Sequence, residues 1–185
     1  FSKPLAPGFR VGWALAPHAI RDKLILAMES AVLSHSTFAQ LAVGRYLETQ
    51  PWREQIKAFR ELYRERRDAM LDALPKYMPE GCTWTKPGGG FFVWMTLPEG
   101  LDSKAILPRA VAARVAFVPG TGFYADGQGS RQMRLSYCYP EPDRIREGVR
   151  RLGAVIEQEL EVRDTFGAGA GRHRPGIDTP GPDLA

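Results

Sequence analysis

The feature that most constrains this chain is one long amphipathic segment between Pro51 and Pro79. Apolar side chains recur there at the spacing of a single helix face, and charged residues fill the other positions. Pro51 is placed to begin this helix, and Pro79-Glu80-Gly81 is placed to end it. At ~1.5 Å per residue, roughly 27 helical residues span ~40 Å, which is long enough to join two lobes. The apolar face consists of Trp52, Ile56, Phe59, Tyr63, Met70, Leu74 and Tyr77.

Before this helix, the pattern predicts a loop, a strand and two shorter helices. Pro17 suits the first turn of a helix, and Thr37 with Gln40 three residues later resembles a capping box. The short apolar run RVGWALA is typical of a buried strand. The predicted elements are a loop over 1–10, a strand over 10–16, and helices over 18–32 and 37–48.

After the long helix, strands alternate with helices, so the body is α/β or α+β. Asp102 or Ser103 is placed to cap a helix that ends near Arg114, and Pro108 is expected to kink it. A turn at Gly88–Gly90 separates the first two strands. The predicted strands are 82–86, 91–97, 115–118 and 133–137, and a final helix runs from 141 to about 160.

The composition changes at Arg163. The remaining residues are rich in glycine and proline and poor in large apolar side chains. Such a segment cannot bury enough surface to offset its ordering entropy, so we expect a disordered tail over 163–185.

Composition excludes several classes of protein. The chain is 44% hydrophobic and 25% charged, which suffices for a core and argues against a wholly disordered chain. Two cysteines do not make a disulfide scaffold, and neither has a partner at zinc-site spacing. No apolar run reaches the ~20 residues of a membrane span, and no signal peptide opens the chain. We therefore expect no metal site and no membrane partner.

The formal charge of +4 raises the alternative of nucleic-acid binding. Basic residues are interleaved with acids, as in Arg64-Glu65-Arg66-Arg67-Asp68. This pattern is typical of a solvated helix face rather than of a surface that follows phosphates. We expect no nucleic-acid partner for this segment.

Lys3 stands in a proline-rich turn just before the predicted strand, and Arg10 follows seven residues later. An isolated lysine is usually no more than a solvated charge. A lysine held in a rigid turn can form a Schiff base with an aldehyde cofactor, and an arginine can bind a phosphate with its planar fork. The pair therefore predicts a site for a phosphorylated aldehyde.

At these residues the sequence resembles a known family. S-K-x-x-x-P-G-x-R-x-G over residues 2–12 is similar to the lysine motif of fold-type-I pyridoxal-phosphate enzymes, and the APG-x-R variant resembles their aminoadipate and kynurenine aminotransferase branch. Three further stretches resemble family motifs in the family order. They are KPGGGFFVW at 86–94, VPGTGFY at 118–124 and RLSY at 134–137.

The resemblance implies a cofactor, pyridoxal 5'-phosphate, and roles for four residues. Lys3 would be the lysine that forms the Schiff base and then serves as general acid and base. Arg10 would bind the cofactor phosphate, with Ser2 near it. Arg134 would bind the substrate α-carboxylate, although outside this motif an arginine on a strand is more often solvated. Independently of the family, Gly88–Gly90 indicates a turn, and Phe91, Phe92 and Trp94 are interpreted as core.

The resemblance also implies an α/β fold made of the family's small C-terminal domain and the last strand of its large domain. Because the chain opens on Phe1 within its most specific motif, we expect that most of the large domain precedes it. The expected organisation is a large-domain remnant over 1–32, a helical connection over 33–80, the small α/β domain over 81–162 and the tail over 163–185.

The function implied by the resemblance is transamination between an amino acid and a 2-oxo acid by a complete, cytoplasmic, homodimeric enzyme. We expect the isolated chain to be inactive. Lyases and synthases share the lysine, so the reaction type stays open, as does the choice among aromatic, branched and aminoadipate-type substrates. The main alternative is the aminotransferase-like effector domain of a winged-helix transcriptional regulator.

Overall fold

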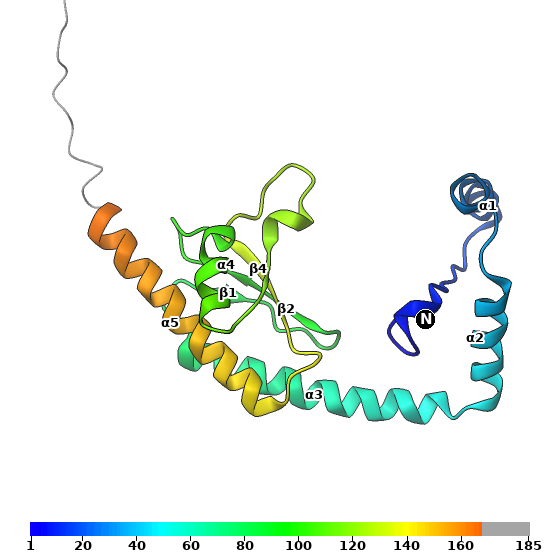
Figure 1. The fold of residues 1–185 in the computed structure, drawn as a ribbon, viewed down its shortest axis with the longest axis horizontal. Coiled ribbons are helices and arrows are strands. Elements are labelled where there is room, and N and C mark those ends of the chain that lie inside the picture. Colours follow the sequence, from blue (N-terminus) through cyan, green and yellow to red (C-terminus); the bar gives the residue numbers. More distant parts are fainter. Residues whose placement is uncertain (168–185) are drawn as a thin grey trace, which may run out of the picture. The chain divides into compact units, whose positions relative to one another are not determined.

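A computed structural model describes residues 1–167, which fall into two compact units. Unit 1 is Phe1–Glu61, and unit 2 begins at Leu62, so the boundary lies inside the long helix (Figure 1). None of the helices in residues 1–167 combines the length and the apolarity that crossing a membrane requires.

Unit 1 is made of three helical elements and the start of a fourth. Helix α1 begins at His18 after Pro17 and ends at Val32, as predicted. Helix α2 follows, but its N-cap is Ser36 rather than the predicted Thr37: the Ser36 hydroxyl accepts a hydrogen bond from the Ala39 N–H at 3.2 Å. The elements are η1 (Pro7–Phe9), α1 (His18–Val32), α2 (Thr37–Thr49) and the first part of α3 (Trp52–Tyr77).

The predicted buried strand over 10–16 is wrong. These residues are irregular in structure, and the side chains of Trp13 and Leu15 are 77% and 93% exposed. A strand is stabilised by hydrogen bonds to a neighbouring strand, and no strand within residues 1–61 is available to supply them. The apolar sequence therefore lies uncovered in this unit.

Helix α3 is the long helix that the sequence predicts, but one of its charged residues is not solvated. Arg66 is only 8% exposed. Its guanidinium donates to the Cys138 carbonyl at 2.8 Å and to Glu141 Oε1 at 2.6 Å. The interleaved charges at 64–68 are therefore not all a solvated face: Arg66 fixes α3 to the residues that lead into the last helix.

Unit 2 is built on a four-stranded antiparallel sheet in the order β1-β2-β4-β3. The predicted strand at 115–118 forms only as the short β3, which pairs with β4 at two positions. The strands are β1 (Thr83–Trp84), β2 (Phe92–Thr96), β3 (Val118–Pro119) and β4 (Gln132–Ser136), and a short turn of helix, η2 (Gly120–Phe123), follows β3.

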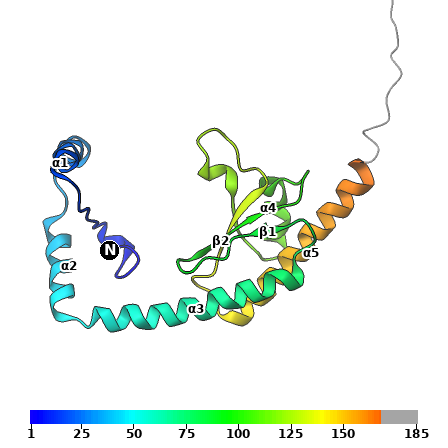
Figure 2. The ribbon, with the colours of Figure 1, turned by 180° about the vertical axis from the view of Figure 1, so that it is seen from behind.

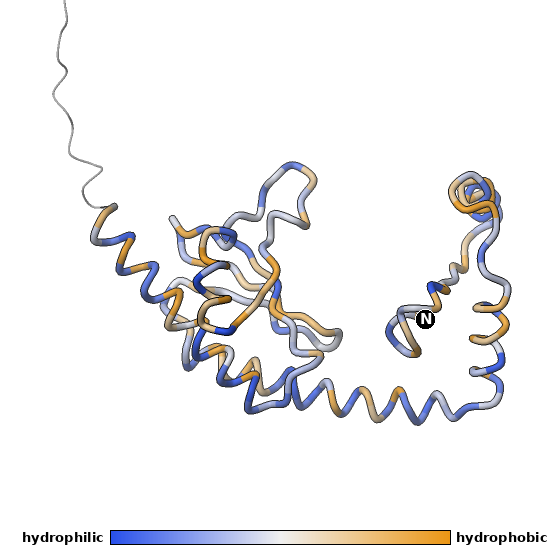
Figure 3. Tube along the Cα trace, in the orientation of Figure 1, coloured by the Kyte–Doolittle hydropathy of each residue, from blue (hydrophilic) through white to orange (hydrophobic). Residues whose placement is uncertain are grey.

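Helices cover one face of this sheet. Alternate side chains of β2 and β4, at Val93, Met95, Met133 and Leu135, are buried against α3, α4 (Ser103–Ala112) and α5 (Pro142–Gly167). Figures 1 and 2 show α5 alongside the second half of α3 from both sides. Apolar and polar residues alternate along both helices in Figure 3, as expected for helices with one buried face.

Two helix ends test the sequence predictions directly. Asp102 caps α4, since its carboxylate accepts from the N–H groups of Lys104 and Ala105 at 2.7 and 3.0 Å. Helix α5 does not stop near Leu160 but continues to Gly167, and Arg163 donates to the Glu99 carbonyl at 2.7 Å. The start of the predicted tail is thus helical, and its remainder, 168–185, lies outside the described residues.

Two glycines of α5 should respond to alanine with opposite signs. A Cβ at Gly153 would collide with the Tyr77 carbonyl oxygen, where α5 crosses the end of α3, whereas a Cβ at Gly148 meets nothing within 4 Å. We expect Gly153→Ala to lower the free energy of unfolding by about 1–3 kcal/mol. Gly148→Ala should raise it by about 0.5–1 kcal/mol, because alanine loses less entropy in a helix.

Urea unfolding of the chain, followed by circular dichroism, measures both changes. Equal effects of the two variants would contradict the close approach of α3 and α5.

Candidate functional site

Residues 1–10, called the lysine turn below, form a compact loop at the start of unit 1. The N–H groups of Leu5 and Ala6 both donate to the Phe1 carbonyl, at 3.1 and 3.3 Å. These bonds fold the chain back on itself, with Lys3 on the exposed outside of the turn. The local sequence explains the turn, because proline at positions 4 and 7 restricts the backbone and rules out a longer helix.

Ser2, Lys3 and Arg10 are brought together. All three line one open hollow of about 360 Å³, together with Phe1, Pro4, Val11 and Gly12. Residues that carry a hydroxyl, an amine and a guanidinium therefore border the same space. An amine that can attack an aldehyde and a fork that can bind a phosphate suit a phosphorylated aldehyde.

Arg10 has an unusual backbone. It ends the short helix η1 with a φ of +53°, in the left-handed region that residues other than glycine rarely adopt. Its Nη1 donates only a long hydrogen bond, 3.4 Å, to the Pro7 carbonyl, and its side chain is exposed. The guanidinium is thus available to a ligand in the hollow.

A residue that the sequence did not single out anchors this turn. Gln55 on α3 donates from Nε2 to the Pro4 carbonyl at 3.3 Å, and its Oε1 accepts from the Tyr46 hydroxyl on α2. The lysine turn is therefore fixed to two helices of unit 1. Nothing in the local sequence around Gln55 distinguishes it from a solvated helix residue, so only the structure reveals this role.

Arg134 lies in unit 2, at the centre of β4. It is paired with Trp94 of β2 on one side and with Val118 of β3 on the other. Because side chains alternate along a strand, Arg134 points away from the helices, whereas Met133 and Leu135 point into the core. The predicted carboxylate-binding residue is thus on the face of the sheet that the helices of this unit leave uncovered.

Aromatic rings surround the Arg134 guanidinium. Its carbon Cζ lies 4.0 Å from the centre of the Phe92 ring and 4.9 Å from that of Phe123. The Phe123 ring in turn packs edge-on against Trp94, at 5.1 Å between ring centres. Phe92 and Trp94 therefore belong to the surroundings of Arg134 and not to the core, which corrects the interpretation drawn from sequence; Phe123 lies in the motif at 118–124, but no role was predicted for it.

The glycine turn at 88–90 lies at the start of β2 and is fixed by side chains. The Tyr137 hydroxyl donates to the Gly89 carbonyl at 3.2 Å, and Arg67 donates to the Gly88 carbonyl at 3.1 Å. Burial raises the pKa of Tyr137 above its ordinary value, so its hydroxyl keeps the proton that it donates. The turn has the structural role that the sequence predicts and sets the first residue of β2.

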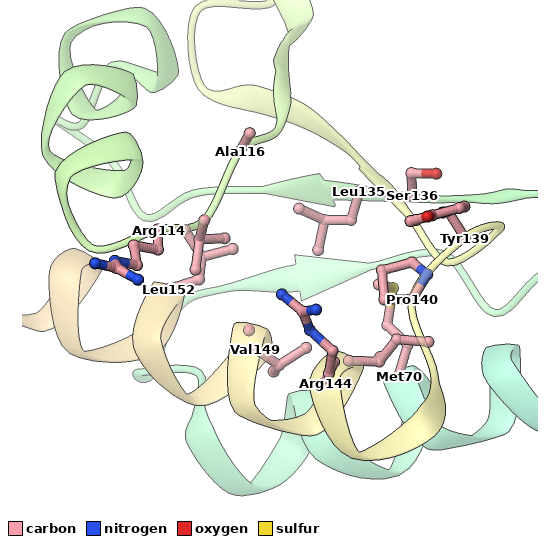
Figure 4. A pocket seen from close by; sticks show the side chains of 13 residues that line it. Met70, Arg114, Ala116, Leu135, Ser136, Tyr139, Pro140, Arg144, Val149 and Leu152 are labelled. Atoms are coloured by element: carbon pink, nitrogen blue, oxygen red, sulfur yellow. The ribbon is translucent and has the colours of Figure 1, made fainter.

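A second hollow, of about 250 Å³, lies on the helix-covered side of the sheet (Figure 4). Its floor is apolar and includes Leu135, Val149 and Leu152. The arginines that line it, Arg114 and Arg144, are exposed, as is Tyr139. None of these polar groups is held by burial, so the hollow lacks the fixed polar contacts of a small-molecule site.

The described residues show no metal centre, and burial suppresses the reactivity of one thiol, that of Cys82. Within residues 1–167, no three His, Cys, Asp or Glu side chains lie close enough to hold a metal ion. Burial raises the pKa of Cys82 to about 11, which suppresses its thiolate at neutral pH. Chemistry at the candidate sites therefore depends on the lysine and the arginines.

Comparison with known proteins identifies the family of the chain. The family model "Aminotransferase class I and II" matches residues 1–152. The chain belongs to the class I and II aminotransferase family. Both the lysine turn and Arg134 lie inside the matched region.

Individual relatives of this family match at high identity. An aromatic-amino-acid aminotransferase of Thermococcus litoralis is 49% identical over 162 residues, which cover 87% of this chain and 39% of that protein. The structure of a multiple substrate aminotransferase from Thermococcus profundus superposes with a TM-score of 0.82 at 48% identity, over 88% of this chain and 40% of that one.

The α-aminoadipate aminotransferase of Thermus thermophilus, solved with N-(5'-phosphopyridoxyl)-L-leucine, gives a TM-score of 0.80 at 41% identity, with 88% and 41% coverage. The chain thus has the α/β fold of these enzymes and spans about 40% of the length of the curated relatives it matches.

Regulators also match, but less closely. An uncharacterised HTH-type transcriptional regulator of Escherichia coli is 32% identical over 161 residues, which cover 86% of this chain and 34% of the regulator. The identity to the Thermococcus litoralis aminotransferase is higher, so the regulator is the less supported alternative.

Proposed function

We propose that the complete polypeptide containing this chain catalyses pyridoxal-phosphate-dependent transamination between an amino acid and a 2-oxo acid. The observation that carries the proposal is the convergence of Ser2, Lys3 and Arg10 on one hollow in a member of the aminotransferase family. A relative solved with a phosphopyridoxyl amino acid supports the choice of cofactor.

Different residues of the lysine turn bind different parts of the cofactor in this proposal. Arg10 binds the phosphate with its fork, and the Ser2 hydroxyl donates to the same phosphate. Lys3 supplies the amine that attaches the cofactor and later holds and moves the proton at the substrate Cα. When bound, pyridoxal phosphate supplies an electron sink that makes this proton acidic.

Arg134 binds the substrate α-carboxylate in this proposal. Within residues 1–167, its side chain has no hydrogen-bonded or ionic partner, and its Nε is buried without an acceptor. A half-buried guanidinium without an acid beside it retains its capacity to pair with a carboxylate. The amino acid and the 2-oxo acid both carry this carboxylate, so one residue serves both half-reactions.

The names of the relatives indicate an amino-acid substrate but do not specify which amino acid. Proteins named for aromatic amino acids and for 2-aminoadipate both match this chain.

We also propose that the complete protein is a homodimer, in line with the family. Large apolar side chains of unit 1 such as Leu15, Leu33 and Phe38 are mostly exposed, and we propose that the rest of the polypeptide and the partner subunit cover them.

Borohydride reduction should place the cofactor on Lys3. In the polypeptide expressed at its full coding length and loaded with pyridoxal phosphate, peptide mass mapping should find a pyridoxyl group on the Lys3 peptide. Lys3→Arg should remove the label and lower transamination by roughly 10²–10⁴-fold, because arginine cannot replace the lysine amine. Lys23→Arg, an exposed position on α1, is the matched control and should retain both. A label on another lysine would refute the assignment.

Replacing Arg134 should weaken substrate binding. We expect Arg134→Gln in the full-length polypeptide to lower kcat/KM for the amino acid and for the 2-oxo acid by about 10–100-fold, because charge-assisted hydrogen bonds to the carboxylate are lost. Arg144→Gln, at an exposed arginine of the same unit, should change neither value by more than about twofold. Equal effects of the two variants would contradict the role of Arg134.

The isolated chain should be inactive. Purified residues 1–185 with added pyridoxal phosphate should give no measurable turnover of aromatic, branched or aminoadipate-type amino acids with a 2-oxo acid. The reason is that most of the large domain implied by the resemblance lies outside this chain, and positioning supplies much of the rate. Turnover by the purified chain would overturn this expectation.

A further inference from the structure

The surroundings of Arg134 are unusual for a charged side chain. Two rings lie within cation–π distance of its guanidinium, Phe92 at 4.0 Å and Phe123 at 4.9 Å. They come from different elements, β2 and η2. All of these residues belong to unit 2, so the arrangement does not depend on how the two units sit relative to each other.

Both phenylalanines also contact further aromatic rings. Phe123 contacts Trp94 edge-on at 5.1 Å, and Trp94 is the β2 neighbour of Arg134 in the ladder. Phe92 contacts Phe91 edge-on, with 6.2 Å between ring centres, and Phe91 contacts Tyr63 of α3 at 4.9 Å. The two rings beside the guanidinium therefore each pack against a further ring.

The rings leave only part of the guanidinium accessible. Nε is buried and has no hydrogen-bond acceptor in the part of the chain that the structure describes. Arg134 makes no side-chain hydrogen bond among residues 1–167, and its terminal nitrogens, unlike Nε, are accessible to solvent. A ligand arriving from solvent meets the two terminal nitrogens first.

We propose that Phe92 and Phe123 are positioning residues that hold the Arg134 guanidinium in one orientation, and that a carboxylate binds to its two terminal nitrogens while Nε stays under the rings. The proposal rests on the proposed function for the identity of the carboxylate. Aromatic rings attract the cation without neutralising it, unlike an acidic side chain, so the guanidinium is oriented at no cost to its charge. It follows that the substrate presents one carboxylate group to the terminal nitrogens of Arg134.

The Arg134 Nε–H signal in nuclear magnetic resonance reports on this arrangement without requiring catalysis. In the chain of residues 1–185 labelled with ¹⁵N-arginine, and with Arg134→Lys for assignment, ring currents should shift the Arg134 Hε upfield. Its exchange with solvent should be slower than that of the exposed Arg144. Phe92→Leu and Phe123→Leu should each move the signal toward the position of Arg144, whereas Phe92→Tyr, which keeps the ring, should leave it at the wild-type position.

Binding of 3-phenylpropionate, a carboxylate with neither an amino nor an oxo group, tests the ligand geometry. We expect it to shift the Arg134 Nη signals strongly and Hε only slightly, and its Kd to rise roughly tenfold in each leucine variant. Phe166→Leu, a phenylalanine that is 75% exposed on α5, should leave the Kd unchanged. An unshifted Hε in the wild-type chain, a large downfield shift of Hε on binding, or leucine variants that bind like wild type would each overturn the proposal.

Misfolding and failure of the proposed function can be told apart from failure of this inference. Phe123 is partly exposed, so Phe123→Leu keeps the core and the amide spectrum of β4 intact even where Phe92→Leu does not. In the full-length enzyme, Phe123→Leu should raise KM for the amino acid and the 2-oxo acid about tenfold, with kcat within about twofold. Loss of kcat alone would contradict a positioning role. A full-length protein without any transamination would refute the proposed function, while the binding measurements on the chain would still decide this inference.

Discussion

The pairing of β2 with β4 is the constraint on which unit 2 depends. Five residue pairs join these strands, from Phe92 opposite Ser136 to Thr96 opposite Gln132. This register places Met133 and Leu135 among the helices and Arg134 on the other face. A slip of one residue would exchange the two sets of side chains, bury the guanidinium and expose the core, so the apolar contacts of α3 and α5 protect the orientation of Arg134 as well as the fold.

The same register assembles the aromatic surroundings of Arg134. Phe92 and Trp94 stand two apart on β2 and therefore share a face with Arg134. Phe123 reaches that face because β3 pairs with β4 at Val118 and Pro119 and the chain then turns through η2. Gly120 permits this turn, since a Cβ there would lie within 3 Å of Gln132. The surroundings of the guanidinium are thus a product of backbone pairing, with no buried acid among residues 1–167 needed to hold the arginine.

Local signals in the sequence predicted the elements that local energetics determine. Pro17 located the start of α1, Asp102 located the cap of α4, and apolar periodicity located α3. Two kinds of feature could not be predicted from local sequence signals. Residues 10–16 have the composition of a strand, but a strand exists only with a partner, which residues 1–61 do not supply. Arg66 has the sequence context of a solvated residue, but it is buried by Cys138 and Glu141, more than 70 positions along the chain.

The two candidate sites differ in how firmly this chain holds them. Arg134 is oriented by a ladder, by two rings and by a continuous apolar core. Lys3 lies on an exposed turn, in a unit where the buried apolar side chains among residues 1–61 are Ala39 and Val43. Since catalysis requires the reacting groups to be held within a fraction of an ångström, Arg134 is already preorganised within its own unit for the role proposed for it, whereas the exposed Lys3 turn needs further packing for its own proposed role.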